Sequence, residues 1–76
     1  MKIEILGFGC PKCKQLEENV RKALEETKKK AEIVKVTDIN EIIKRGVMVT
    51  PAVIIDGKLK AFGRIPEVEE IKKWIQ

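Results

Sequence analysis

The two cysteines of the chain lie three residues apart, in the segment Cys10-Pro11-Lys12-Cys13. This segment stands between an apolar run that predicts a strand and a longer run with helical periodicity. A Cys-x-x-Cys at such a junction is typical of a redox pair, because two sulfurs separated by about one helical turn can close an internal disulfide. The predicted chemistry is thiol–disulfide exchange.

The positions of the two thiols predict different roles. Cys10 is expected at the N-cap of the helix, with Pro11 at its first position. The free amide groups of the first turn and the nearby Lys12 and Lys14 would then favour a thiolate at Cys10 and lower its pKa below the ordinary value of about 8.5. Cys13 falls on the apolar stripe of the helix, so we expect it to be less exposed and to have the higher pKa. Cys10 is therefore predicted to attack a substrate disulfide and Cys13 to resolve the mixed disulfide that results.

Other interpretations of the cysteine pair remain open at this point. The pair could be a structural disulfide, two inert core cysteines, or a site for a soft metal such as Cu(I), Zn or As(III). The last alternative would make the chain a metal-binding module or metallochaperone, like the small domains that carry Cys-x-x-Cys after their first strand in the order βαββαβ. A tetrahedral zinc site would need two further ligands, and the chain contains no histidine. No metal and no cofactor are expected, since the cysteine pair itself can carry the electrons.

The apolar pattern predicts seven elements that would position this pair. Four strands are expected over residues 1–6, 31–36, 52–55 and 59–62. Helices are expected over residues 11–29, from Asp38 as N-cap to Gly46 as the left-handed residue after the helix, and from Pro66 as first residue to the C-terminus. Asp56-Gly57 between two apolar runs predicts a tight hairpin. The order β-α-β-α-β-β-α makes the first two strands parallel and the last two antiparallel, in a four-stranded mixed sheet with helices on both faces.

Within the second helix, the pattern assigns three isoleucines, Ile39, Ile42 and Ile43, to the stripe that faces the core. The last helix is expected to place Val68, Ile71 and Ile75 on its inner face.

Composition limits the classes of protein that the chain can be. With 76 residues it has room for one domain, spanning residues 1–76, and its 43% hydrophobic and 37% charged residues suit a packed core under a charged surface. No apolar run is long enough for a membrane span and the start does not read as a signal peptide, so a cytoplasmic monomer is expected. A net charge of +4 and only three aromatic residues make binding to nucleic acid an unfavoured interpretation, and without a long apolar run no membrane partner is expected. The abundance of Lys and Glu over Asn and Gln is often seen in hyperthermophiles.

Three segments together carry a resemblance that spans the chain. They are Gly9-Cys10-Pro11-Lys12-Cys13 after the first predicted strand, Val49-Thr50-Pro51-Ala52 at the start of the third, and Asp56-Gly57 in the hairpin. With the predicted element order, they make the chain similar to small thioredoxin-like proteins with a redox-active disulfide, in a minimal glutaredoxin-sized fold. The resemblance implies a disulfide oxidoreductase that exchanges disulfides with protein or small-thiol partners and is regenerated by an external reductase or thiol.

The same resemblance implies further site residues. It implies a cis peptide bond between Thr50 and Pro51, where an extended substrate segment would pair beside Cys10. Pro11, Lys12 and Gly63 are expected to contact the substrate as well. Thioredoxins place a buried carboxylate six residues before their first cysteine, the offset of Glu4. Glu4 is expected either to accept a proton there or, as the more ordinary arrangement, to pair with a cation such as Lys35 on the neighbouring strand.

The chain also departs from the family pattern. The dipeptide within the motif is Pro-Lys, Gly9 stands where thioredoxins typically have tryptophan, and Gly63-Arg64-Ile65-Pro66 replaces the glutathione-binding cluster of glutaredoxins. No redox potential and no use of glutathione can therefore be carried over.

Overall fold

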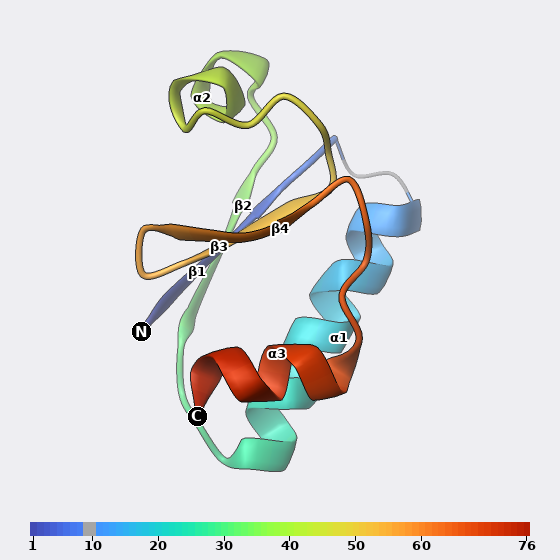
Figure 1. Ribbon diagram of the computed structural model, residues 1–76, viewed down its shortest axis with the longest axis vertical. Helices are drawn as coiled ribbons and strands as arrows, with labels where there is room; N and C mark the ends of the chain where they lie inside the picture. Colours follow the sequence, from blue (N-terminus) through green and yellow to red (C-terminus); the bar gives the residue numbers. More distant parts are fainter. Residues whose placement is uncertain (9–10) are drawn as a thin grey trace.

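A computed structural model describes residues 1–8 and 11–76 of the chain. The elements follow in the order β1 (Lys2–Leu6), α1 (Pro11–Thr27), β2 (Glu32–Val36), α2 (Ile39–Lys44), β3 (Ala52–Ile55), β4 (Lys58–Phe62) and α3 (Val68–Ile75) (Figure 1). This is the predicted order, and its mixed sheet with three helices confirms the predicted α/β fold class. No helix within the described residues is both long enough and apolar enough to cross a membrane.

The four strands form one sheet in the order β2-β1-β3-β4. β1 pairs with β2 in parallel, and β3 pairs antiparallel with both β1 and β4. The parallel strands β1 and β2 are joined by the crossover helix α1, whereas the antiparallel strands β3 and β4 are joined by a two-residue turn. The turn residues Asp56 and Gly57 have φ angles of 49° and 82°, the positive values that a type I′ hairpin requires. The predicted hairpin is confirmed.

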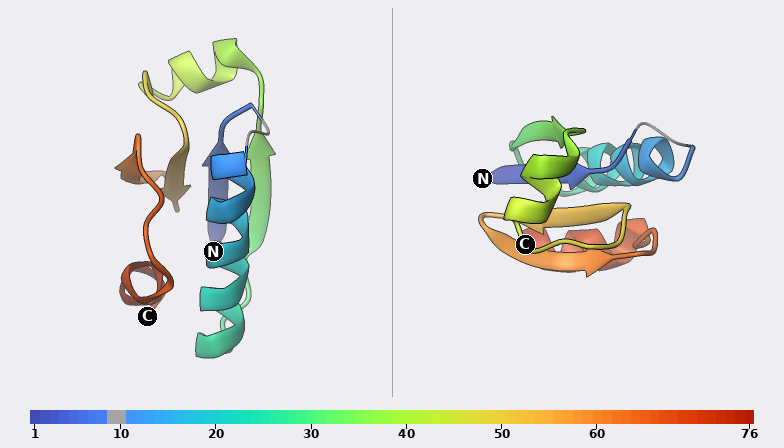
Figure 2. Two further views of the ribbon diagram at one scale, coloured as in Figure 1. Left: turned by 90° about the vertical axis from the view of Figure 1, so that its right-hand side faces the viewer. Right: turned by 90° about the horizontal axis from the view of Figure 1, so that it is seen from above.

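Each face of the sheet covers its own apolar cluster. On one face, α1 and α3 lie side by side, and Leu16, Val20 and Ile71 pack against Ile3 and Ile5 of β1. On the other face, α2 and the segment after it lie near the end of the sheet at which β1 and β2 finish (Figures 1 and 2). The alternation of side chains along β1 therefore decides which face each residue of this strand serves.

The ends of two helices differ from the prediction. α1 ends at Thr27, because Lys28 adopts a positive φ of 58° and the Lys29 amide returns to the Leu24 carbonyl at 3.1 Å. Pro66 does not open α3: it is buried and precedes the N-cap residue Glu67. The Glu67 amide donates instead to the Glu70 carboxylate at 3.3 Å. By contrast, the predicted N-cap Asp38, which accepts from the Asn40 amide, and the positive φ of Gly46 are both confirmed.

The predicted apolar stripe of α2 is wrong for two of its three residues. Ile42 is buried, but the side chains of Ile39 and Ile43 are 57% and 60% exposed. The helix has only six residues, fewer than two turns, and Ile42 is the one isoleucine of the three that it buries. The other two, four residues apart, form an exposed apolar stripe.

The packing of α1 on β1 predicts a large stability cost when Leu16 is truncated. Leu16 has no exposed surface, so Leu16→Ala should lower the free energy of unfolding by about 2–5 kcal/mol. Leu59→Ala is the matched control, because Leu59 is 41% exposed and its truncation should cost less than about 1 kcal/mol. Denaturant titration of both variants measures the difference, and equal losses would contradict the assignment of the core.

Candidate functional site

The first turn of α1 holds the described part of the cysteine motif. α1 begins at Pro11, the helix position predicted for this proline, and Pro11 and Lys12 are exposed. Cys13 is buried, with 7% of its surface exposed, and lies on the helix face that continues through Leu16 and Val20. Gly9 and Cys10 lie outside the described residues, so the predicted N-cap position of Cys10 stays a prediction. The expected burial of Cys13 is confirmed.

Gly7 gives the Cys13 side chain its space. Gly7 continues the alternation of Ile3 and Ile5, so it faces α1 from the end of β1. A Cβ atom built on Gly7 would overlap the Cys13 sulfur. Any other residue at position 7 would displace this sulfur or the backbone, and the missing side chain is therefore what lets α1 bring Cys13 against the strand.

The residues predicted for substrate contact from the second half of the chain lie next to one another. The peptide bond between Thr50 and Pro51 is cis. Pro51 is buried and Thr50 is half-buried, and the Gly63 amide donates to the Pro51 carbonyl at 2.9 Å. Gly63 has a φ of 71°, and a Cβ there would stand 2.9 Å from the Val49 side chain, so position 63 favours glycine twice over. The start of β3 and the end of β4 thus form one structural unit.

An apolar groove extends from Thr50 toward α2. Its volume is about 390 Å³, and none of the residues that line it in the described part of the chain is charged. Phe8, from the loop that leads to the cysteine motif, lies on one side, with the exposed isoleucines of α2 and Met48 also lining the groove. Met48 is 94% exposed and Phe8 57% exposed. This groove was not predicted from the sequence, because the apolar pattern of α2 placed its three isoleucines in the core.

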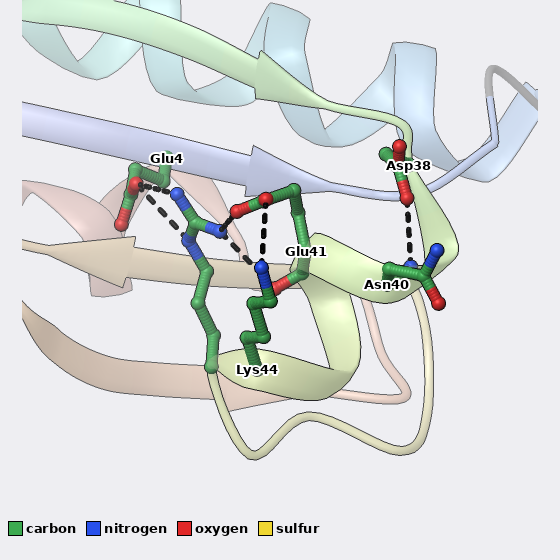
Figure 3. Close-up of polar contacts among 6 residues, drawn as sticks. Glu4, Asp38, Asn40, Glu41 and Lys44 are labelled. Atoms are coloured by element: carbon green, nitrogen blue, oxygen red, sulfur yellow. Dashed lines mark hydrogen bonds and ion pairs between the residues drawn. The ribbon is translucent and has the colours of Figure 1, made fainter.

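Glu4 and Cys13 lie on opposite faces of the sheet. Its carboxylate pairs with Arg45, at 2.9 Å from Nη2, and Arg45 also binds the Glu41 carboxylate at 3.0 Å (Figure 3). Glu4 alternates with Ile3 and Ile5 and so points to the face of the sheet that carries α2, away from α1. The expectation that Glu4 pairs with a cation is correct, but the expected partner Lys35 is wrong.

Lys35 pairs instead with Glu17 of α1. The distance from Lys35 Nζ to Glu17 Oε1 is 2.8 Å, and Arg21 binds the other carboxylate oxygen at 2.8 Å. The hydrogen bonds from Lys35 and then Arg21 lower the pKa of the Glu17 carboxyl below its ordinary value. The sequence held a signal that was missed, since Glu17 follows Cys13 by four residues and so shares its helix face.

Comparisons with known proteins agree with this architecture. A family model described as a thioredoxin domain matches residues 1–76. The chain belongs to the thioredoxin domain family. It is 58% identical over 71 residues to a thioredoxin of Methanocaldococcus jannaschii, and the aligned region covers 93% of this chain and 81% of that protein. It is 42% identical over 73 residues to a thioredoxin of Methanothermobacter thermautotrophicus, covering 96% and 95%.

The resemblance inferred from the motifs is therefore confirmed, and this thioredoxin-family chain is a thiol–disulfide oxidoreductase. The alternative of a metallochaperone receives no support from the comparisons. The element order also differs from the βαββαβ order expected for that alternative, because the helix α2 follows β2 where that order has a strand.

The contact between Gly7 and Cys13 predicts a strong coupling between the two positions. Gly7→Ala should lower the free energy of unfolding by about 1–3 kcal/mol, because the added methyl group overlaps the sulfur. In a Cys13→Ala background the same change should cost less than about 0.5 kcal/mol, since the overlapping atom is gone. A double-mutant cycle by denaturant titration of the reduced proteins measures this coupling. Additive costs would show that the sulfur does not occupy the space beside Gly7.

Proposed function

We propose that Cys10 is the attacking thiol and Cys13 the resolving thiol of this oxidoreductase. Support comes from the start of α1 at Pro11, which puts Cys10 next to a helix N-terminus in the sequence, and from the burial of Cys13 one turn further on. Amide groups at a helix N-terminus stabilise a thiolate, and the exposed Lys12 and Lys14 add positive charge nearby. The burial of Cys13 carries the assignment, since it leaves Cys10 as the thiol for first contact with a protein.

The reaction proceeds in two exchanges. The Cys10 thiolate attacks one sulfur of the substrate disulfide, forms a mixed disulfide and releases the other substrate sulfur as a thiolate. The Cys13 thiolate then attacks the Cys10 sulfur and releases the second substrate thiolate. The substrate gains two electrons, and the protein is left with a disulfide between Cys10 and Cys13. An external reductase or a small thiol returns the pair to the dithiol, so no resident cofactor takes part.

Thr50, Pro51 and Gly63 form the proposed platform for the substrate chain, together with Pro11 and Lys12 at the start of α1. The hydrogen bond from the Gly63 amide to the Pro51 carbonyl links the segment before β3 to the segment after β4. Thr50 and Phe8 both line the apolar groove. Because the described residues that line the groove are uncharged and include Phe8, which precedes the cysteine motif in the sequence, we assign the groove to apolar side chains that flank the target disulfide in a protein. We further propose that the protein acts as a monomer in the cytoplasm, where a reductant can regenerate the dithiol.

The two thiol roles predict which variant traps a substrate. Cys13→Ser should accumulate a mixed disulfide with an unfolded, disulfide-intact protein, because nothing resolves it. Cys10→Ser should not accumulate one, since the buried Cys13 cannot reach a protein disulfide. Non-reducing electrophoresis with mass spectrometry of the linked peptide identifies the trapped sulfur. Trapping by Cys10→Ser at the level of Cys13→Ser would reverse the assignment.

The groove predicts a defect that is specific to protein substrates. Ile43→Ser should raise KM for unfolded, disulfide-intact lysozyme about tenfold, the effect of losing part of one buried isoleucine contact. Its rate with a small aromatic disulfide, which cannot span the groove, should be unchanged. Leu59→Ser is the matched control, because this exposed leucine lies beside the hairpin turn and does not line the groove. A KM unchanged in Ile43→Ser, or raised equally in Leu59→Ser, would exclude the groove as the docking site.

A further inference from the structure

The apolar groove is built almost entirely by one short stretch of chain. Apart from Phe8, every described residue that lines the groove lies between Ile39 and Thr50, in α2 or in the loop that follows it. Residues 39–50 are here named the groove segment. The position of this segment on the sheet therefore decides the shape of the groove.

Few apolar side chains attach the groove segment to the sheet. Within it only Ile42 of α2 and Val47 of the following loop are buried. The amides of residues 45–47 donate to carbonyls of residues 41–43, so these bonds shape the segment without attaching it to a strand. Segments with few buried apolar contacts open more readily than the core. A further attachment is therefore needed to keep the groove segment in one position.

Arg45 supplies a polar attachment to β1. It is the C-cap residue of α2 and does not line the groove. Its Nε and Nη2 donate to Oε1 of Glu4 at 3.2 and 2.9 Å, across 41 positions of the sequence. Its Nη1 donates to the carbonyl and the carboxylate of Glu41 at 3.1 and 3.0 Å, which holds the guanidinium group on α2 itself. One side chain thus joins β1 to the helix that lines the groove (Figure 3).

The burial of this ion pair makes it a stronger restraint than an exposed pair. The side chains of Glu4 and Arg45 are 12% and 28% exposed. Water screens charge-assisted hydrogen bonds less in such surroundings, and loss of one partner leaves the other charge buried and unpaired. Glu4 lies on β1, which pairs with a strand on each side. The carboxylate is therefore the fixed end of the contact, and Arg45 holds the groove segment to it.

We propose that Arg45, held by Glu4, is a positioning residue that keeps the groove segment in the orientation that admits a protein substrate. The pair thereby sets the preference of the oxidoreductase for proteins over small disulfides. It acts on docking and not on the thiols, because Glu4 and Cys13 lie on opposite faces of the sheet. This inference rests on the proposed role of the groove in docking.

Steady-state kinetics with two substrates test the proposal. Arg45→Met and Glu4→Gln should each raise KM for unfolded, disulfide-intact lysozyme about tenfold, because the groove segment then takes the competent position in only about a tenth of the molecules. The value of kcat and the rate with a small aromatic disulfide should be unchanged. The two changes together should raise KM no more than either alone, since both break the same contact. Arg45→Lys keeps the charge and should recover part of the affinity.

Two matched controls separate positioning from an ordinary loss of stability. Glu41→Gln removes the ion pair within α2 but leaves the contact with Glu4, so KM should be unchanged. Lys72→Met breaks an ion pair of 3.1 Å with Glu26 that joins α3 to α1 on the other face of the sheet, and it should also leave KM unchanged. A KM raised equally in Lys72→Met, or unchanged in both Arg45→Met and Glu4→Gln, would overturn the inference.

Hydrogen exchange followed by mass spectrometry gives a readout that does not depend on activity. In Glu4→Gln the amides of the groove segment should exchange about tenfold faster than in the wild type, whereas those of α1 should keep their rates. Equal acceleration along the whole chain would show a general loss of stability and overturn the inference. If Ile43→Ser raises KM but Arg45→Met and Glu4→Gln do not, this inference alone fails. A KM unchanged in Ile43→Ser would exclude the proposed docking groove and the inference with it.

Discussion

The packing of the apolar stripe of α1 against the first face of the sheet is the constraint on which the site depends. Leu16 and Val20 have no exposed surface, and Cys13 lies one turn before Leu16 on the same stripe. Burial of Cys13 is therefore a consequence of core formation, as is its contact with Gly7. The asymmetry proposed for the two thiols depends on this burial, because Cys13 is held at the edge of the core whereas Cys10 precedes the helix in the sequence.

The two faces of the sheet carry different parts of the proposed site. The face under α1 holds Cys13 and the ion pair of Glu17 and Lys35. The other face holds Glu4 with Arg45, and the groove of α2 lies at its end. The strand alternation of β1 separates Glu4 from Cys13, whereas Glu17 of α1 and Lys35 of β2 line the pocket beside Cys13.

Local signals predicted most of the fold. The order of the elements, the hairpin at Asp56-Gly57 and the left-handed Gly46 depend on residues close in sequence, and all are confirmed. The exposure of Ile39 and Ile43 and the partner of Glu4 depend on how far a six-residue helix reaches over the sheet. No periodicity encodes this distance. The contact of Gly7 with Cys13 is likewise a product of how α1 docks.

The pH dependence of alkylation at each cysteine tests the central claim most directly. The reduced protein is pulsed with iodoacetamide across the pH range, and mass spectrometry quantifies the modification at Cys10 and Cys13 separately. Cys10 should react first, with a midpoint well below the ordinary thiol value of about 8.5, while Cys13 stays protected until higher pH. Equal reactivity of the two thiols with unshifted midpoints, or faster modification of Cys13, would contradict the account.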